Sequence, residues 1–317
     1  MDKTNKQPSM LYKYRSFSVM TLESLCRDSL YFAHPGTFND PLDCNPTIEC
    51  DSEIDELQKL LTFLIKKRVS KETLESLEKV RIQGKKAATH AEKIARTESN
   101  SKLASIAYHA TNPDYEIGVS EAKRWLIVQE IERELKRHYD RGVCCFSTNY
   151  SSPVLWSHYG DQHKGICIGY SLDRKQRPNP QKVIYGKSRS VKTSTLVKAF
   201  LDDSEEAKEN LDQDILLRKA KGWRYEREWR LIDKHGMQIS PLLLKEIIFG
   251  LRCTSSVIHS IVQSLSGRKR AVNFYKMYEV RGNYTIRRRK VDLDELDASM
   301  PINAEFIDDL LTDDDDL

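Results

Sequence analysis

The sequence predicts an α+β fold, in which a mixed, mostly antiparallel sheet carries helices between its strands and a helical subdomain is inserted into it. Two observations carry this prediction. Short aromatic and β-branched runs between turn residues fill 1–50 and 141–300, whereas 51–140 contains almost no Gly or Pro and repeats apolar residues at helical spacing. We therefore expect an α+β catalytic core over 1–50 and 141–300, a helical insertion over 51–140, and an acidic tail over 301–317.

Composition and charge narrow the class of protein. A chain of 317 residues with 39% hydrophobic and 31% charged residues can bury a sizeable core, and its net charge of +4 is too small to indicate a partner. The seven cysteines are odd in number and lack any Cys-x-x-Cys spacing, which favours reduced thiols. There is no signal-type apolar run near the start and no run approaching ~18 apolar residues, so we expect a cytoplasmic protein that does not span a membrane.

The segment before the insertion predicts two strands, one short helix and a polar loop. The aromatic run 10–17 and the run 29–33 are typical of strands, and 21–28 places Leu22 and Leu25 at helical spacing. The loop over 34–46 is dense in Pro, Gly, Asn and Asp. Because binding residues often sit on loops held by a rigid scaffold, we expect its polar side chains to turn toward a site.

The insertion predicts three or four helices. Leu57, Leu60, Leu61 and Leu64 recur at a period of about 3.6 residues. Helix breaks are expected near Ser70, near Gly84 and at 111–114, and the last helix is expected over 120–139.

The part of the chain after the insertion predicts alternating strands and helices. Helices are expected over a short stretch opening at Pro153, over 192–221 before the stop signal Gly222, and over 254–265. Strands are expected at 142–149, 165–170, 182–185, 225–232, 242–250, 273–280 and 284–291.

The stretch from Gly222 to Ile232 is the most unusual in the chain, because it combines two Trp, one Tyr, three Arg and two Glu. If successive side chains point to opposite faces of a strand from Tyr225 onward, Glu226, Glu228 and Arg230 share one face. The two glutamates are then about 7 Å apart at ~3.3 Å per residue. Two carboxylates so close together predict either a ladder of ion pairs or an active-site acid with a supporting partner.

The sequence lacks the motifs of several common metal-binding, nucleotide-binding and catalytic sites. His158 and His163 stand five residues apart and do not share a helix face, and no cysteine pair has ligand spacing, so no metal site is expected. The sequence holds no Walker loop, no Gly-x-Gly-x-x-Gly and no Gly-x-Ser-x-Gly. Cys144 and Cys145 lie within a predicted strand, where a buried thiol is inert.

Three polar motifs at strand ends remain, namely Tyr14-Arg15, Ser147-Thr148-Asn149 and Glu226-x-Glu228. An arginine can hold a phosphate by two parallel hydrogen bonds. A carboxylate can stabilise the oxocarbenium-like state through which a glycosidic bond breaks. Each motif also has a structural explanation, since Arg15 can pair with a carboxylate and the hydroxyls can satisfy turn backbone groups.

The chain resembles the bacterial family labelled domain of unknown function 2971, over most of its length apart from the insertion and the tail. The resemblance lies in four segments: LYKYRS, YFAHPGTFNDPLD, FSTNYSSPVLWSHYGDQHKGICIGY and YEREWRLI. This family label implies no activity of its own.

The order of the three motifs is also similar to the Arg, Ser-Thr-Ser, Glu-x-Glu pattern of ADP-ribosyltransferases. This resemblance implies that Arg15 holds a phosphate of NAD and that Ser147 and Thr148 brace the nicotinamide pocket. It implies that Glu228 hydrogen-bonds the ribose next to nicotinamide and stabilises the oxocarbenium ion, and that Glu226 positions or deprotonates the acceptor. Asn149 departs from the pattern, because it stands where the family has its third hydroxyl.

Further residues become candidates for the same cleft by residue type and loop position. They are Tyr14, Asn39, Asp40, His158 and Tyr159.

The resulting hypothesis is an ADP-ribosyltransferase-like enzyme that uses NAD as a substrate and modifies a macromolecule, in the setting of a toxin or a phage-defence effector. Its expected partners are the acceptor, protein or nucleic acid, and an inhibitory protein. The alternative is a nucleic-acid-binding or nuclease-type defence protein, in which Glu226, Glu228 and Asp40 bind a divalent metal. A third hypothesis is an interaction module without catalysis.

Overall fold

A computed structural model describes residues 7–138, 141–174, 176 and 178–301. The chain divides into two compact units. The first comprises Met1–Phe32, Val143–Lys182 and Arg224–Leu317, and the second comprises Ala33–Gly142 and Val183–Trp223. The predicted acidic tail lies outside the described residues from 302 onward.

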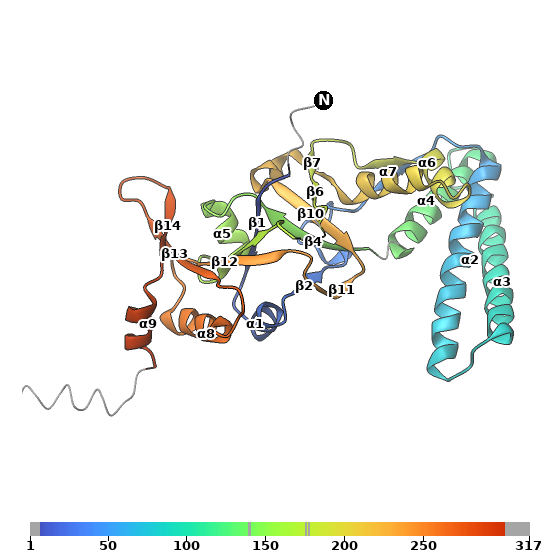
Figure 1. The fold of residues 1–317 in the computed structure, drawn as a ribbon. Helices are drawn as coiled ribbons and strands as arrows, with labels where there is room; N and C mark the ends of the chain where they lie inside the picture. Colours follow the sequence, from blue (N-terminus) through green and yellow to red (C-terminus); the bar gives the residue numbers. More distant parts are fainter. Residues whose placement is uncertain (1–6, 139–140, 175, 177, 302–317) are drawn as a thin grey trace, which may run out of the picture. The chain divides into compact units, whose positions relative to one another are not determined.

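The first unit is built on an eight-stranded sheet with the order β14-β13-β12-β5-β1-β4-β10-β6 (Figure 1). Its strands are β1 (Met10–Arg15), β4 (Gly142–Ser147), β5 (Ile166–Ser171), β6 (Gln181–Lys182), β10 (Glu228–Asp233), β12 (Leu243–Phe249), β13 (Asn273–Glu279) and β14 (Ile286–Lys290). A small second sheet pairs β2 (Ser29–Phe32) with β11 (Gly236–Ile239).

The large sheet is mixed and mostly antiparallel, which confirms the predicted fold class. β1 pairs antiparallel with β4 and β5, and β12 pairs antiparallel with β5. β12 and β13 are parallel, and the helix α8 (Ser255–Leu265) connects them. A parallel pair needs such a long connection, whereas antiparallel neighbours can be joined by short turns.

Helices cover both faces of this sheet (Figure 1). On one face, Leu11, Phe146 and Trp229 pack with residues of α1 (Val19–Cys26) and α8. On the other face, Tyr12 and Tyr14 pack against α5 (Pro153–Tyr159). We call these the α8 face and the α5 face. Adjacent residues of a strand point to opposite faces, so β1 contributes to both cores. β5 is buried at all of its positions, as its apolar run predicts.

The second unit is mainly helical. Its elements are η1 (Pro35–Thr37), β3 (Thr47–Glu49), α2 (Ile54–Lys79), α3 (Lys85–His109), α4 (Val119–His138), β7 (Ile184–Tyr185), β8 (Ser190–Lys192), α6 (Thr193–Phe200), α7 (Glu205–Leu216) and β9 (Arg218–Lys219). Small residues at every fourth position of α3 are buried, which lets α2 and α3 approach closely. Arg68 on α2 binds both carboxylate oxygens of Glu134 on α4, at 2.8 and 3.1 Å.

This second unit is larger than the insertion expected over 51–140. It also includes 33–50 and 183–223, which the prediction had kept with the core. The pairing of β3 with β8 and the packing of α6 on α2 join these segments to the helices.

Several predicted boundaries are wrong for local reasons. α2 continues through Ser70, where neither Gly nor Pro interrupts the helical spacing. The single helix expected over 192–221 is two helices, because Asp203 has a φ of 55° and Ser204 caps α7 through the amide of Ala207. The strand expected over 182–185 is divided between β6 and β7, which belong to different sheets.

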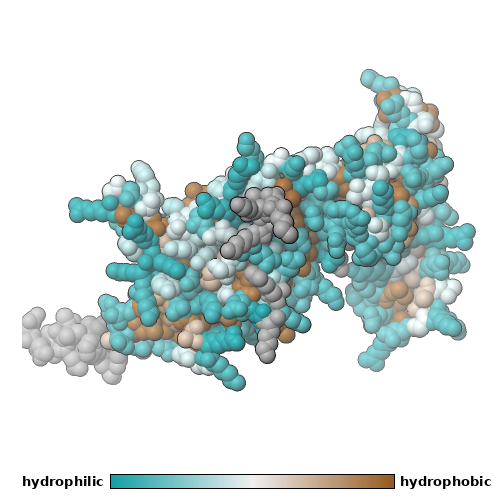
Figure 2. Space-filling view, turned by 45° about the horizontal axis from the view of Figure 1, so that its top comes forward, coloured by the Kyte–Doolittle hydropathy of each residue, from teal (hydrophilic) through white to brown (hydrophobic). Residues whose placement is uncertain are grey.

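The visible surface is largely hydrophilic, with hydrophobic side chains scattered over it (Figure 2). No helix within the described residues is long and apolar enough to cross a membrane. Several short elements were not predicted from the sequence, among them β11 and α9 (Leu293–Ser299).

We expect Trp156→Ala to lower the free energy of unfolding by about 3–5 kcal/mol, because a fully buried indole leaves a cavity when it is removed. Val154→Ala on the same helix is the matched control. Val154 is 45% exposed, and its removal should change stability by no more than about 0.5 kcal/mol. Urea denaturation of both variants measures this difference, and equal losses would contradict the burial of Trp156.

Candidate functional site

Two of the three strand-end motifs meet on the α5 face. β1, β4 and β10 are consecutive neighbours in the sheet. Tyr12 stands opposite Ser147, and side chains of directly opposed residues share a face. The Ser147 hydroxyl donates a hydrogen bond to the Glu226 carbonyl at 2.6 Å, which joins the Ser-Thr motif to the Glu-x-Glu motif.

The alternation predicted that the two glutamates lie on one regular strand, but they do not. Glu226 ends a 3-10 helix, η2 (Lys221–Glu226), and β10 begins only at Glu228. Arg227 between them has a φ of 48°, in the left-handed region that ordinary residues rarely adopt. Tertiary contacts of the buried acids therefore override the strand propensity of Tyr225 to Glu228.

Glu226 is 5% exposed and accepts a hydrogen bond from the Tyr159 hydroxyl at 2.6 Å. Because Tyr159 belongs to α5, this bond places the carboxylate on the α5 face. Both acids are thus on the same face, although a helical turn rather than a strand puts Glu226 there.

Glu228 pairs with Arg230 inside the sheet. The Glu228 carboxylate accepts from Nε of Arg230 at 2.7 Å and from Nη2 at 3.2 Å. Glu228 is 4% exposed and Arg230 is completely buried. A guanidinium and a carboxylate that meet through two hydrogen bonds offset part of the cost of removing both charges from water.

Neutral proton donors lie on the same face as these charges. Loss of water around the Cys145 thiol, and then the negative charge of Glu228, raise the pKa of Cys145 well above its usual value. Burial likewise raises the pKa of Tyr14, whose hydroxyl donates to the Asn149 carbonyl at 2.7 Å. These groups keep their protons at neutral pH, so the charge of the site lies on its carboxylates and arginines.

A second ion pair lies on the same face, between buried Glu246 on β12 and half-buried Arg288 on β14. The Arg288 guanidinium is enclosed by two rings, with its centre 4.4 Å from Tyr150 and 4.3 Å from Tyr275. A Cβ on Gly169 would come within 2.5 Å of Glu246, which explains a glycine inside a buried strand. This arrangement anchors the segment after β4, from which α5 and Tyr159 follow.

The remaining predicted site residues take different positions. Thr148 uses its backbone amide to bind the Arg227 carbonyl at 3.4 Å. His158 is exposed, with its ring 6.4 Å from Tyr225 and 6.0 Å from Tyr159. Arg15 does not join the acids.

Arg15 turns to the α8 face, because it alternates with Tyr14 along β1. It also lies three residues beyond Tyr12, about 10 Å along the strand at ~3.3 Å per residue. The sheet therefore separates its guanidinium from the two glutamates.

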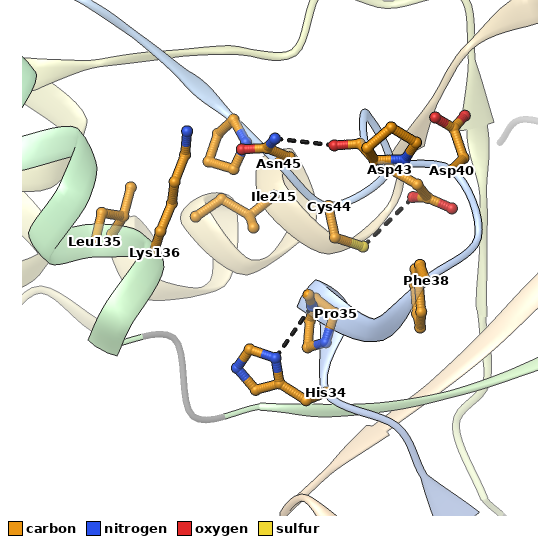
Figure 3. Close-up of a pocket in the computed structure, with 13 residues that line it drawn as sticks. His34, Pro35, Phe38, Asp40, Asp43, Cys44, Asn45, Leu135, Lys136 and Ile215 are labelled. Carbon is orange, nitrogen blue, oxygen red and sulfur yellow. Dashed lines mark hydrogen bonds between the residues drawn. The ribbon is translucent and has the colours of Figure 1, made fainter.

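Asn39 and Asp40, which we expected near the cleft, belong to the second unit. There the loop 34–46 borders a pocket of 320 Å³ (Figure 3). Asp40 accepts from the indole nitrogen of Trp223 at 2.7 Å, and buried Asp43 pairs with Lys219 at 3.2 Å. These bonds hold the loop in shape, so its polar residues have a structural role within this unit.

Sequence reasoning missed Cys145, Glu246 and Arg288. Arg230 was placed on the correct face but was not identified as a partner. The alternation of Glu228 with Arg230 was the available signal, because opposite charges two residues apart share a strand face. No local signal links Glu246 to Arg288, which stand 42 residues apart.

Residues 155–231 match the model of a family described as protein of unknown function (DUF2971). This match confirms the predicted resemblance to that family, and its range contains Tyr159, Glu226 and Glu228. Comparison with curated proteins and with solved structures gave no match. The similarity to ADP-ribosyltransferases stays a prediction. Within the described residues, no three His, Cys, Asp or Glu side chains are grouped so that they could hold a metal ion.

We expect Arg230→Met to cost about 3–5 kcal/mol of unfolding free energy, because it leaves the Glu228 charge buried without its partner. The double variant Glu228→Gln with Arg230→Met should recover most of this loss. Arg289→Met, at an exposed position of β14, is the control and should have little effect. Urea denaturation tests this, and a double variant no more stable than Arg230→Met would contradict the pairing.

The Cys145 thiol should make stability fall in alkali. Its folded pKa is raised, so its contribution is complete below the unfolded thiol pKa of about 8.5 and is lost progressively as pH rises above that value. We expect Cys145→Ala to show a shallower decline between pH 8 and pH 10 (roughly the range of thiol ionisation) than the wild type. Cys26→Ala, at an exposed cysteine, should leave the decline unchanged. Identical slopes in all three proteins would refute the effect.

Proposed function

We propose that this chain is an ADP-ribosyltransferase that uses NAD as a substrate. One observation carries the proposal: the hydrogen bond from Ser147 to the Glu226 carbonyl joins two of the three motifs at one end of neighbouring strands. Both acids of the Glu-x-Glu motif are buried on this face, and a setting of low dielectric strengthens the interaction of a carboxylate with a developing positive charge.

The proposed chemistry breaks the bond between the ribose anomeric carbon and the nicotinamide nitrogen. Nicotinamide leaves with the bonding electrons, and an acceptor atom then bonds to the same carbon and loses its proton. Glu228 stabilises the oxocarbenium-like state, and its ion pair with Arg230 favours the charged form of the carboxylate. Glu226 positions the acceptor and receives its proton, and the Tyr159 hydroxyl holds the Glu226 carboxylate in place by a hydrogen bond.

The phosphates of NAD need a cation on the α5 face, where Arg15 does not reach. Arg224 and Arg227 flank Glu226 in the sequence, and both are exposed. We propose that they take the phosphate-binding role that the resemblance had given to Arg15.

The acceptor in this proposal is a macromolecule. The exposed ring of His158 lies next to Tyr159, and the partly buried ring of Tyr225 lies 6.4 Å from His158. These rings offer a contact surface near the proposed reaction. Metal-dependent cleavage of nucleic acid gains no comparable support, since Asp40 forms its own contacts within the second unit.

Purified protein should release nicotinamide from NAD, and Glu228→Gln and Glu226→Gln should each reduce the rate by at least about 100-fold, the usual cost of removing an electrostatic catalytic group. Tyr159→Phe should reduce it less, because it removes only one hydrogen bond to Glu226. Glu279→Gln, at an exposed position of β13, is the matched control and should retain full activity.

Circular dichroism would show that each variant is folded. If Glu228→Gln unfolds, Glu226→Gln and Tyr159→Phe still decide the question. Nicotinamide release that is absent from the wild type, or unchanged in both folded Glu226→Gln and Tyr159→Phe, would refute the proposal.

A further inference from the structure

A separate pocket of 310 Å³ opens on the α8 face of the sheet, on the side opposite the two glutamates. Its floor is apolar and consists of buried Leu30 and Ile168, and Met237, which is 43% exposed, also lines the pocket. Its charged lining consists of Lys13 and Arg15, and no Asp or Glu borders it among the described residues. The pocket therefore combines two positive charges with an apolar floor.

The surroundings of Arg15 indicate most clearly that this pocket binds an anion. Its side chain is half-buried, yet it makes no hydrogen bond or ion pair with any residue that the structure describes. The other half-buried or buried arginines of this sheet, Arg230 and Arg288, each have a carboxylate partner. A guanidinium partly removed from water without a partner is unfavourable, so the position favours an external anion.

Lys13 adds a second cation held in place. It is directed to the pocket by the same alternation along β1, and its ammonium donates to the Cys145 carbonyl at 3.1 Å. It also lies 5.3 Å from the centre of the Phe146 ring. An ammonium has three donors, and these contacts leave capacity for an oxygen ligand.

Hydroxyl groups line the same pocket beside the start of α1. Ser18 caps the amide of Thr21, and the Thr21 hydroxyl donates to the Ser16 carbonyl at 3.0 Å. The first turn of α1 carries no acidic residue, so nothing in it opposes an anion next to Arg15. The described lining thus combines cations and hydroxyls with no acidic side chain, and each of these features favours an anionic ligand.

We propose that this pocket binds a phosphomonoester with a compact apolar group, the phosphate on Arg15 and Lys13 and the apolar group on Leu30, Ile168 and Met237. Its volume is at the small end of ligand pockets, which suits one phosphate and one ring but not a dinucleotide. The site is distinct from the proposed NAD site, because the sheet lies between them.

Calorimetric titration of the full chain with phenyl phosphate tests this proposal. We expect saturable binding that weakens with added salt, and binding of phenol at least about 10-fold weaker. Arg15→Ala should weaken phenyl phosphate binding by at least about 10-fold, the loss expected for one charge-assisted bidentate contact. The matched control Arg289→Ala, an exposed arginine on β14, should bind as the wild type does.

Two further titrations separate this site from the proposed active site. Glu228→Gln should retain phenyl phosphate binding, and saturating NAD should not displace the ligand. Displacement by NAD would assign the pocket to the NAD site and overturn the proposal of a second site.

Three other results would also overturn the proposal of a second site. They are no binding of phenyl phosphate, equally tight binding of phenol, and equal affinities of Arg15→Ala and Arg289→Ala for phenyl phosphate. If Arg15→Ala is unfolded, Arg15→Gln, which keeps a long side chain without the charge, replaces it and should show the same loss.

Discussion

The ion pair between Glu228 and Arg230 is the constraint on which the candidate site depends. Arg230 is completely buried on β10, which lies next to the edge strand β6, and a buried guanidinium is stable only with a partner. Its bond to Glu228 fixes the first residue of β10. Once this residue is fixed, the left-handed turn at Arg227 sets the direction of Glu226, which then meets Tyr159 from α5 and Ser147 from β4.

Polar groups are unevenly distributed between the two faces of the sheet. The α5 face carries one buried and one partly buried ion pair and several tyrosines, whereas the α8 face carries an aliphatic and aromatic core. Every polar group of the α5 face needs a partner, because an unsatisfied one would be destabilising. Such networks specify one arrangement of the chain, and here they hold the residues that we propose for catalysis. Around Lys13 and Arg15 the α8 face carries polar groups.

Sequence reasoning predicted elements well where one physical signal dominated. The continuous apolar run of β5 predicted a strand buried on both faces, and Pro153 predicted the start of α5. It was wrong at Ser70 and between Tyr225 and Glu228. At Ser70 the polar residue was read as a break although it is compatible with a helix, and near Glu228 the alternation of residue types continued through a turn that only buried partners stabilise.

The sequence by itself determined the α+β class, the types of most elements and the presence of two neighbouring acids beside an arginine, because these follow from local periodicity and residue chemistry. Only the tertiary structure decided which of these residues meet. It brought Ser147 to Glu226, paired Glu246 with Arg288, and placed Arg15 on the opposite face from the acids. Strand order and the facing of side chains across a sheet depend on contacts between residues far apart in the chain, and local patterns do not encode such contacts.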